Sequence, residues 1–94
     1  MPIVHVFQNE GKLQSIGFID ESGKKRKTVV AVEIGKYNLG EAKCREFIFV
    51  LSGSIRGKGD VYSEEGNQMP LVFKRGETVE FEVLADALYI CHFD

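Results

Sequence analysis

Apolar and polar residues alternate in short stretches along this 94-residue chain, and glycine-containing turns separate the stretches. Residues 78–83 (Thr-Val-Glu-Phe-Glu-Val) alternate without exception, so one face of the segment is apolar and the other carries glutamates. A period of two is typical of a half-buried β-strand. By the same criterion and by their β-branched and aromatic content, further strands are expected at residues 3–7, 12–19, 28–34, 54–56, 61–62, 71–73 and 87–93.

The stretch at residues 45–53 departs from this alternation. Arg45 and Glu46 are followed by five consecutive apolar residues and then by Ser-Gly. So short an apolar run, closed by a turn signal, predicts a strand that is covered on both faces. Because strand side chains alternate, Glu46 shares a face with Ile48 and Val50. A carboxylate directed toward a core is costly unless it is paired or lies at the mouth of a cavity, so Glu46 is the first candidate functional residue.

The remaining segments predict turns. Glycines punctuate residues 35–40, which are expected to form a turn and a short edge piece, and residues 8–11 and 20–23 are turn sequences. The basic run at residues 24–27 is expected at a hairpin tip, either solvated or as a phosphate contact. No segment has helical periodicity. The pattern therefore predicts a single all-β domain over residues 1–94, a sandwich or a barrel.

Composition narrows the class of function. Twelve Lys and Arg against fourteen Asp and Glu give a net charge of -2, which does not indicate a nucleic-acid partner. No apolar run is long enough for a membrane span, and residues 1–5 lack the pattern of a secretion signal, so a cytoplasmic protein is expected. Cys44 and Cys91 lie far apart and only two histidines are present, so we expect buried free cysteines and neither a metal nor another cofactor.

Glu46, followed after six intervening residues by Gly53, resembles the end of the first conserved motif of the cupin superfamily. That motif places a His-x-His pair just before the glutamate, but residues 40–43 contain no histidine. The second cupin motif has Pro-x-Gly and then a metal-binding histidine. Its counterpart here is residues 74–76, with Val79 at the histidine position. The resemblance therefore implies a cupin without the usual metal centre.

Within that superfamily, four blocks resemble the small pyrimidine/purine nucleoside phosphorylases: residues 12–18, 29–37, 46–53 and 89–91. The resemblance implies a single-domain cupin-like β-barrel or jelly-roll, and a homodimer. It implies an enzyme that uses inorganic phosphate to split purine and pyrimidine nucleosides into a free base and a pentose 1-phosphate, without metal. The turn at residues 74–77 departs from the family, where a hydrophobic Val-Pro-Gly-like turn is usual.

In that chemistry Glu46 is the expected catalytic residue, because a carboxylate can accept hydrogen bonds from ribose hydroxyls or stabilise an oxocarbenium-like transition state. The alternative is a structural carboxylate paired with Arg45 or Lys43. Cations can hold phosphate, aromatic rings can stack on the base, and a serine can donate to phosphate. On these grounds the expected substrate-binding residues are Ser15, Phe18, Tyr37, Arg56, Lys74, Arg75 and Tyr89, although surface or core roles remain open for each of them.

Two other interpretations stay open. A non-catalytic cupin module would hold a small polar ligand, such as a nucleoside or a sugar, without turnover, and the altered turn at residues 74–77 favours it. A metal-dependent cupin enzyme would require histidine ligands that this chain lacks at the motif positions.

Overall fold

The computed structural model describes residues 3–8, 12–64 and 69–94. Its strands are β1 (Ile3–Gln8), β2 (Leu13–Ile19), β3 (Lys25–Val32), β4 (Gly35–Glu41), β5 (Glu46–Gly57), β6 (Asp60–Ser63), β7 (Leu71–Phe73) and β8 (Thr78–Phe93). The prediction of an all-β fold is confirmed. Within the described residues there is no helix, and hence none that could cross a membrane.

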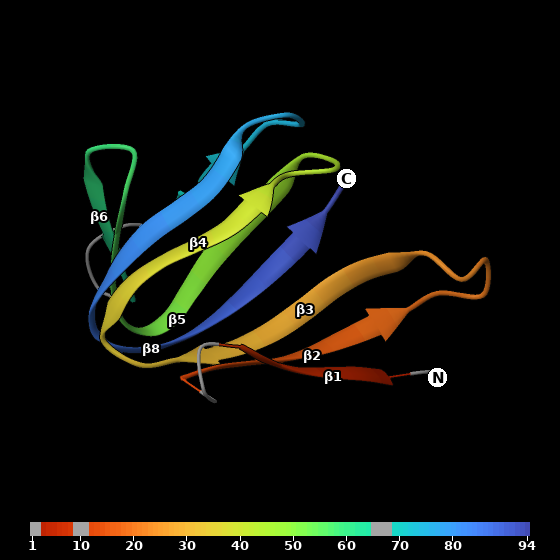
Figure 1. Cartoon of the computed structure of the whole chain (residues 1–94), viewed down its shortest axis with the longest axis horizontal. Coiled ribbons are helices and arrows are strands. Elements are labelled where there is room, and N and C mark those ends of the chain that lie inside the picture. The colour runs from red at the N-terminus through yellow and green to blue at the C-terminus, as the bar shows by residue number, and fades with distance from the viewer. Residues whose placement is uncertain (1–2, 9–11, 65–68) are drawn as a thin grey trace.

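All eight strands belong to one antiparallel sheet (Figure 1). The hydrogen-bonded order is β1-β2-β3-β8-β5-β6, while β4 pairs with β8 and β7 pairs with β5. Among the described strands no pairing joins β1 to β4 or to β6, so the sheet is open and not closed on itself.

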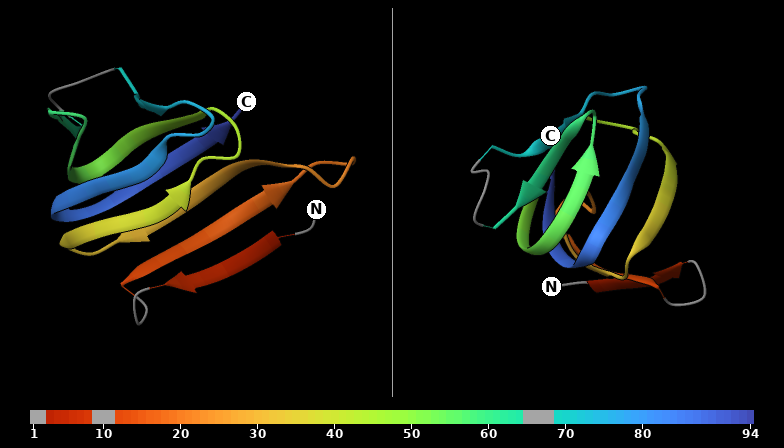
Figure 2. Two further views of the ribbon diagram at one scale, coloured as in Figure 1. Left: turned by 45° about the horizontal axis from the view of Figure 1, so that its top comes forward. Right: turned by 90° about the vertical axis from the view of Figure 1, so that its left-hand side faces the viewer.

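Two long strands fold this sheet over. The first half of β8 pairs with β4 and with the end of β5, as in the partners Tyr37 and Phe81. Its second half pairs with β3 and with the start of β5, as in the partners Ile48 and Cys91. The result is a large leaf (β1, β2, β3, the second half of β8 and the first half of β5, with β7) and a small leaf (β4, the first half of β8, the second half of β5, and β6) (Figure 2).

The two long strands bend together at Gly53. This glycine has φ +81°, and the register between β5 and β8 shifts on either side of it. A Cβ atom placed there would lie 2.2 Å from the carbonyl oxygen of Asp86. The two backbones therefore approach more closely than any other residue type allows, and glycine at position 53 is a steric requirement of the bend.

The core fills the space between the leaves. Its buried side chains are Leu13, Val30, Val32, Tyr37, Ala42, Ile48, Ile55, Leu71, Phe73, Val79, Phe81, Val83, Ala87, Tyr89 and Cys91. Aromatic rings connect the leaves: the Phe81 ring lies 5.8 Å from that of Tyr37 and 5.9 Å from that of Tyr89, centroid to centroid. The Tyr37 hydroxyl donates a 2.6 Å hydrogen bond to the carbonyl of Glu33, which ties β4 to the end of β3.

Four local expectations are corrected. Residues 35–41 form a full strand, because residues 35–38 and 41 pair with the first half of β8. Residues 78–93 form one bent strand that Asp86 does not end. The basic residues Lys25, Arg26 and Lys27 lie within β3, not at the hairpin tip. The apolar run of β5 is not covered on both faces, since Phe49 and Leu51 are 38% and 41% exposed. Of the predicted turn at residues 8–11, positions 9–11 lie outside the described residues.

We predict that Gly53→Ala lowers the free energy of unfolding far more than Gly59→Ala does. Both glycines have positive φ (+81° and +85°), so both substitutions carry the cost of that backbone conformation, about 1–2 kcal/mol. Nothing lies within 4 Å of a Cβ at Gly59, whereas a Cβ at Gly53 collides with the backbone of Asp86 and Ala87. The measurement is urea unfolding. An equal loss in both variants would contradict the steric account of the bend.

Candidate functional site

A pocket with a cavity volume of about 160 Å³ lies on the inner face of the large leaf. We call it the interior pocket. It is lined by Leu13, Ser15, Lys25, Thr28, Val30, Leu39, Glu46, Ile48, Val79, Tyr89, Cys91 and Phe93. The set combines an apolar wall with hydroxyl, thiol, carboxyl and ammonium groups, which is the composition usual for a small-molecule site.

The strand register brings the hydroxyl groups of this pocket together. Ser15 pairs with Val30, which pairs with Tyr89, so these three stand in one row across β2, β3 and β8. Thr28 and Cys91 stand in the next row on the same face. Within the described residues, the side-chain hydroxyls of Ser15, Thr28 and Tyr89 have no hydrogen-bond partner, and no fully buried polar atom is left unpaired. The three hydroxyls therefore face accessible space, where a ligand or water can bond to them.

Glu46 lines this pocket and is half-buried. The thiol of Cys91 lies 3.5 Å from the Glu46 Oε1 atom and donates to it. Burial raises the pKa of Glu46 above its ordinary value, and the Cys91 hydrogen bond and the charge of Lys25 offset part of that rise.

The alternative explanation of Glu46, a surface ion pair, does not hold. Arg45 pairs with Asp94 instead, its Nη2 atom lying 2.5 Å from Oδ2. Lys43 lies 3.4 Å from the carboxylate of Glu41. Glu46 is therefore free of the two partners that would give it a purely structural role.

Cys91 is a proton donor and not a nucleophile in this arrangement. Burial raises the pKa of its thiol, and the negative charge of Glu46 raises it further. Burial likewise raises the pKa of the Tyr89 hydroxyl. At neutral pH both groups keep their protons and can donate hydrogen bonds into the pocket.

Lys25 is the residue that sequence reasoning missed. Its aliphatic stem crosses Gly17, where a Cβ would lie 2.9 Å from the Lys25 Cδ atom. Its ammonium lies 5.3 Å from the centre of the Phe93 ring, a cation–π contact at the edge of the pocket. Gly17, which has no side chain, is a weak sign in the sequence that another side chain lies across it. The register shift after Phe18, which turns Lys25 inward, could not be predicted from the sequence.

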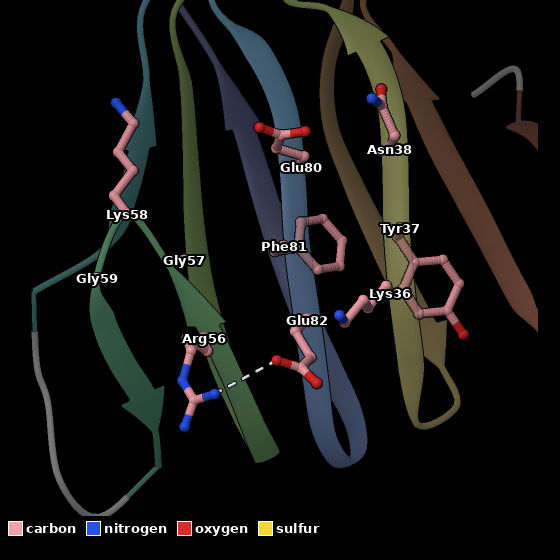
Figure 3. A pocket seen from close by; sticks show the side chains of 10 residues that line it. All are labelled: Lys36, Tyr37, Asn38, Arg56, Gly57, Lys58, Gly59, Glu80, Phe81 and Glu82. Carbon is pink, nitrogen blue, oxygen red and sulfur yellow. Dashed lines mark hydrogen bonds and ion pairs between the residues drawn. The ribbon is translucent and has the colours of Figure 1, made fainter.

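A second depression, the outer groove, lies over the small leaf and has a volume of about 440 Å³ (Figure 3). Lys36, Glu82 and Arg56 form a row across β4, β8 and β5, and the Arg56 Nη1 atom lies 3.4 Å from the Glu82 Oε1 atom. Arg56 and Glu82 pair with each other, and the groove is shallow and open. We therefore regard the interior pocket, where three hydroxyl groups have no partner among the described residues, as the candidate site.

The predicted site residues do not all gather in one place. Ser15, Glu46 and Tyr89 meet in the interior pocket. Tyr37 and Arg56 line the outer groove, and the Tyr37 ring is 5% exposed, as expected for a core residue. Phe18 lies in a separate surface depression with Arg26 and Lys27.

Lys74 and Arg75 occupy the turn between β7 and β8, and neither lines the interior pocket or the outer groove. Glu77 organises that turn. Its Oε1 atom accepts a 2.5 Å hydrogen bond from the Lys74 backbone amide and lies 2.8 Å from the Lys58 ammonium. The structure therefore does not support a phosphate contact from Lys74 or Arg75 to a ligand at Glu46.

Comparison with known proteins establishes the fold and no activity. A protein of unknown function from Vibrio parahaemolyticus (domain 2-94) matches with a TM-score of 0.62 and 20% identity over 98% of each chain. A DUF1255 protein of unknown function from Acinetobacter sp. ADP1 matches with a TM-score of 0.60 and 15% identity, over 99% of this chain and 93% of that one. No family model and no curated protein matches.

These comparisons contradict the predicted kinship with the small nucleoside phosphorylases. The two solved structures just named are described only as proteins of unknown function, and neither a family model nor a curated relative supports that enzyme. The prediction of a nucleoside phosphorylase is corrected accordingly. The four sequence blocks that suggested it consist largely of strand and turn residues that the fold itself requires.

No metal centre is evident in the part of the chain that the structure describes, where no three His, Cys, Asp or Glu side chains are grouped to hold an ion. The pocket's one carboxylate, Glu46, is accompanied by a protonated thiol and by a cation. That donor set suits hydrogen bonding to a neutral polar molecule better than it suits metal coordination.

We predict that Glu46→Gln stabilises the protein at neutral pH. A carboxyl group whose pKa is raised by folding favours the folded state at low pH, and this contribution is lost as the pH rises through the raised pKa. Glutamine is neutral throughout, so its advantage should be present at pH 7 and should vanish well below the ordinary value of 4.5.

The measurement is the thermal midpoint of both proteins between pH 3 and pH 8. Glu80→Gln, which removes an exposed carboxylate from the outer groove, is the control and should show no such pH-dependent gain. If the Glu46→Gln variant is less stable than the parent at pH 7, Glu46 gains more from its partners than burial costs it, and the prediction is wrong.

Proposed function

We propose that this protein binds a small polyhydroxylated ligand, a sugar or the sugar portion of a nucleoside, in the interior pocket and releases it unchanged. The observation that carries the proposal is the convergence of polar groups on one small cavity. The hydroxyls of Ser15, Thr28 and Tyr89 have no partner among the described residues, and the carboxyl group of Glu46 and the ammonium of Lys25 lie at the same cavity.

The chemistry of these groups fits hydroxyl groups on the ligand. A sugar hydroxyl both donates and accepts, and the pocket offers the same mixture. Glu46 accepts when ionised, Lys25 and the Cys91 thiol donate, and the three protein hydroxyls do either. Leu13, Val30 and Ile48 provide the apolar wall against which the C–H face of a sugar ring packs.

Pocket size limits the ligand. Sites for drug-sized molecules usually measure roughly 300–1,000 Å³. The interior pocket, at about 160 Å³, has room for a group of pentose size. A nucleoside would place its sugar at Glu46 and its base at the rim, where Phe93 and Leu39 lie.

We also propose that the folded sheet is an open form of the cupin-like barrel or jelly-roll. Two features support this: β5 and β8 fold one sheet into two facing leaves, and a polar pocket lies on the inner face. In such a frame the interior is a ligand site and not a fully packed core.

The test is NMR titration of the full chain with a panel of pentoses, hexoses and nucleosides. We expect shift changes centred on Ser15, Thr28 and Tyr89 for at least one hydroxylated ligand. We expect Glu46→Ala to weaken that binding at least tenfold, because one charge-assisted hydrogen bond is worth about 1.5–3 kcal/mol. Glu80→Ala, on the outer groove, should bind as the parent does.

Recovery of the ligand distinguishes binding from conversion. Chromatography of the mixture after prolonged incubation should return the ligand unaltered. Binding that survives Glu46→Ala, or shift changes confined to the outer groove, would place the ligand elsewhere. Absence of any shift change across the panel would overturn the proposal.

A further inference from the structure

The outer face of the large leaf is apolar across four strands. Register aligns Ile16, Val29, Ile90 and Phe49 in one row over β2, β3, β8 and β5. Leu88 and Leu51 belong to the next row on the same face, where the register between β5 and β8 shifts. We call these six residues the outer apolar face. Four of them, Ile16, Phe49, Leu88 and Leu51, are between 37% and 41% exposed.

Isolated exposed apolar residues are common on protein surfaces, but a contiguous set over several strands marks an interaction surface. The face consists of regular antiparallel strands, and such sheets pack on one another face to face about 10 Å apart. A flat apolar sheet face is therefore suited to a second sheet as its partner.

Ionisable side chains flank the two ends of this face, with a lysine at one end and a net negative charge at the other. Lys27 and His92, which are cross-strand partners on β3 and β8, stand at one end. Glu33 and Asp86 stand at the other end, where they line a shallow depression together with Lys12 and Leu88, so two carboxylates face one ammonium there. Among the described residues neither Lys27 nor Glu33 forms an ion pair, and the Asp86 carboxylate accepts one hydrogen bond, from the Ile34 amide.

We propose that two copies of this chain associate through the outer apolar face, related by a two-fold axis that lies in the interface and runs across the strands. This axis reverses the order of the rows from one copy to the other. The Ile16–Phe49 row then packs on the Leu88 and Leu51 row of the second copy, and vice versa, as an isologous interface requires.

The charges decide this orientation over the alternative. With the axis across the strands, Lys27 faces the second copy's Glu33, and His92 faces the second copy's Asp86. An axis along the strands would instead bring like ends together. Glu33 of each copy would then face Asp86 of the other copy, and carboxylates would oppose each other across the interface. Opposite-charge contacts fix register and suppress wrong orientations, and the contact between Lys27 and Glu33 favours only the first arrangement.

The first test compares Phe49→Glu with Val61→Glu by sedimentation equilibrium. Val61 is more exposed than Phe49 (47% against 38%) and lies on β6, outside the face. We expect the parent and Val61→Glu to be dimers and Phe49→Glu to be a monomer with an unchanged far-UV circular dichroism spectrum. A monomeric parent at about 100 µM, or a dimeric Phe49→Glu variant, would overturn the proposal.

The second test concerns orientation and uses a charge exchange. Lys27→Glu and Glu33→Lys should each raise the dimer dissociation constant about tenfold or more at low salt, because each places like charges together twice in the symmetric dimer. The double variant restores both contacts and should return within about threefold of the parent. Losses that simply add in the double variant would overturn the proposed axis. A parent that is monomeric and binds an apolar surface such as a lipid vesicle would reassign the face to that partner.

Discussion

The bend shared by β5 and β8 is the constraint on which the rest of this structure depends. Both strands are long enough to serve two leaves, and they can turn together only because the backbone of Asp86 occupies the space where a side chain at Gly53 would lie. If these strands ran straight, the sheet would have no inside, and Tyr37 and Phe81 would not reach the ring of Tyr89. The core and the interior pocket are thus consequences of one close backbone contact.

Strand alternation and pairing bring the polar side chains of the interior pocket together. Alternation sends Ser15, Thr28, Tyr89 and Cys91 to the same side, and antiparallel pairing brings them from three strands into two adjacent rows. Glu46 reaches the same space from the start of β5. Its half-burial raises the pKa of its carboxyl group, so the site combines a carboxyl group whose ionised form burial disfavours with donors that stay protonated at neutral pH.

Period-two reasoning predicted the parts of this picture that depend on one strand at a time. The all-β class, the inward face of residues 78–83 and the unusual position of Glu46 followed from the sequence. The features that depend on pairing between strands could not be predicted in this way. Residues 35–41 have weak strand character and form β4 because β8 supplies a partner, and Lys25 turns inward through a register shift. The exposure of Phe49 and Leu51 was missed because an apolar run does not reveal whether a second layer covers it. The family resemblance failed for a related reason, since strand and turn residues repeat across unrelated functions.

Gly17 affects the charge of the interior pocket although it has no side chain. The stem of Lys25 lies across Gly17. Its ammonium can reach the pocket edge because no side chain occupies this position on the neighbouring strand. The electrostatic character of the pocket therefore depends on a residue that contributes no functional group. A larger residue at position 17 would displace this positive charge and remove the cation that lowers the pKa of Glu46, while every polar group that lines the pocket remained in the sequence.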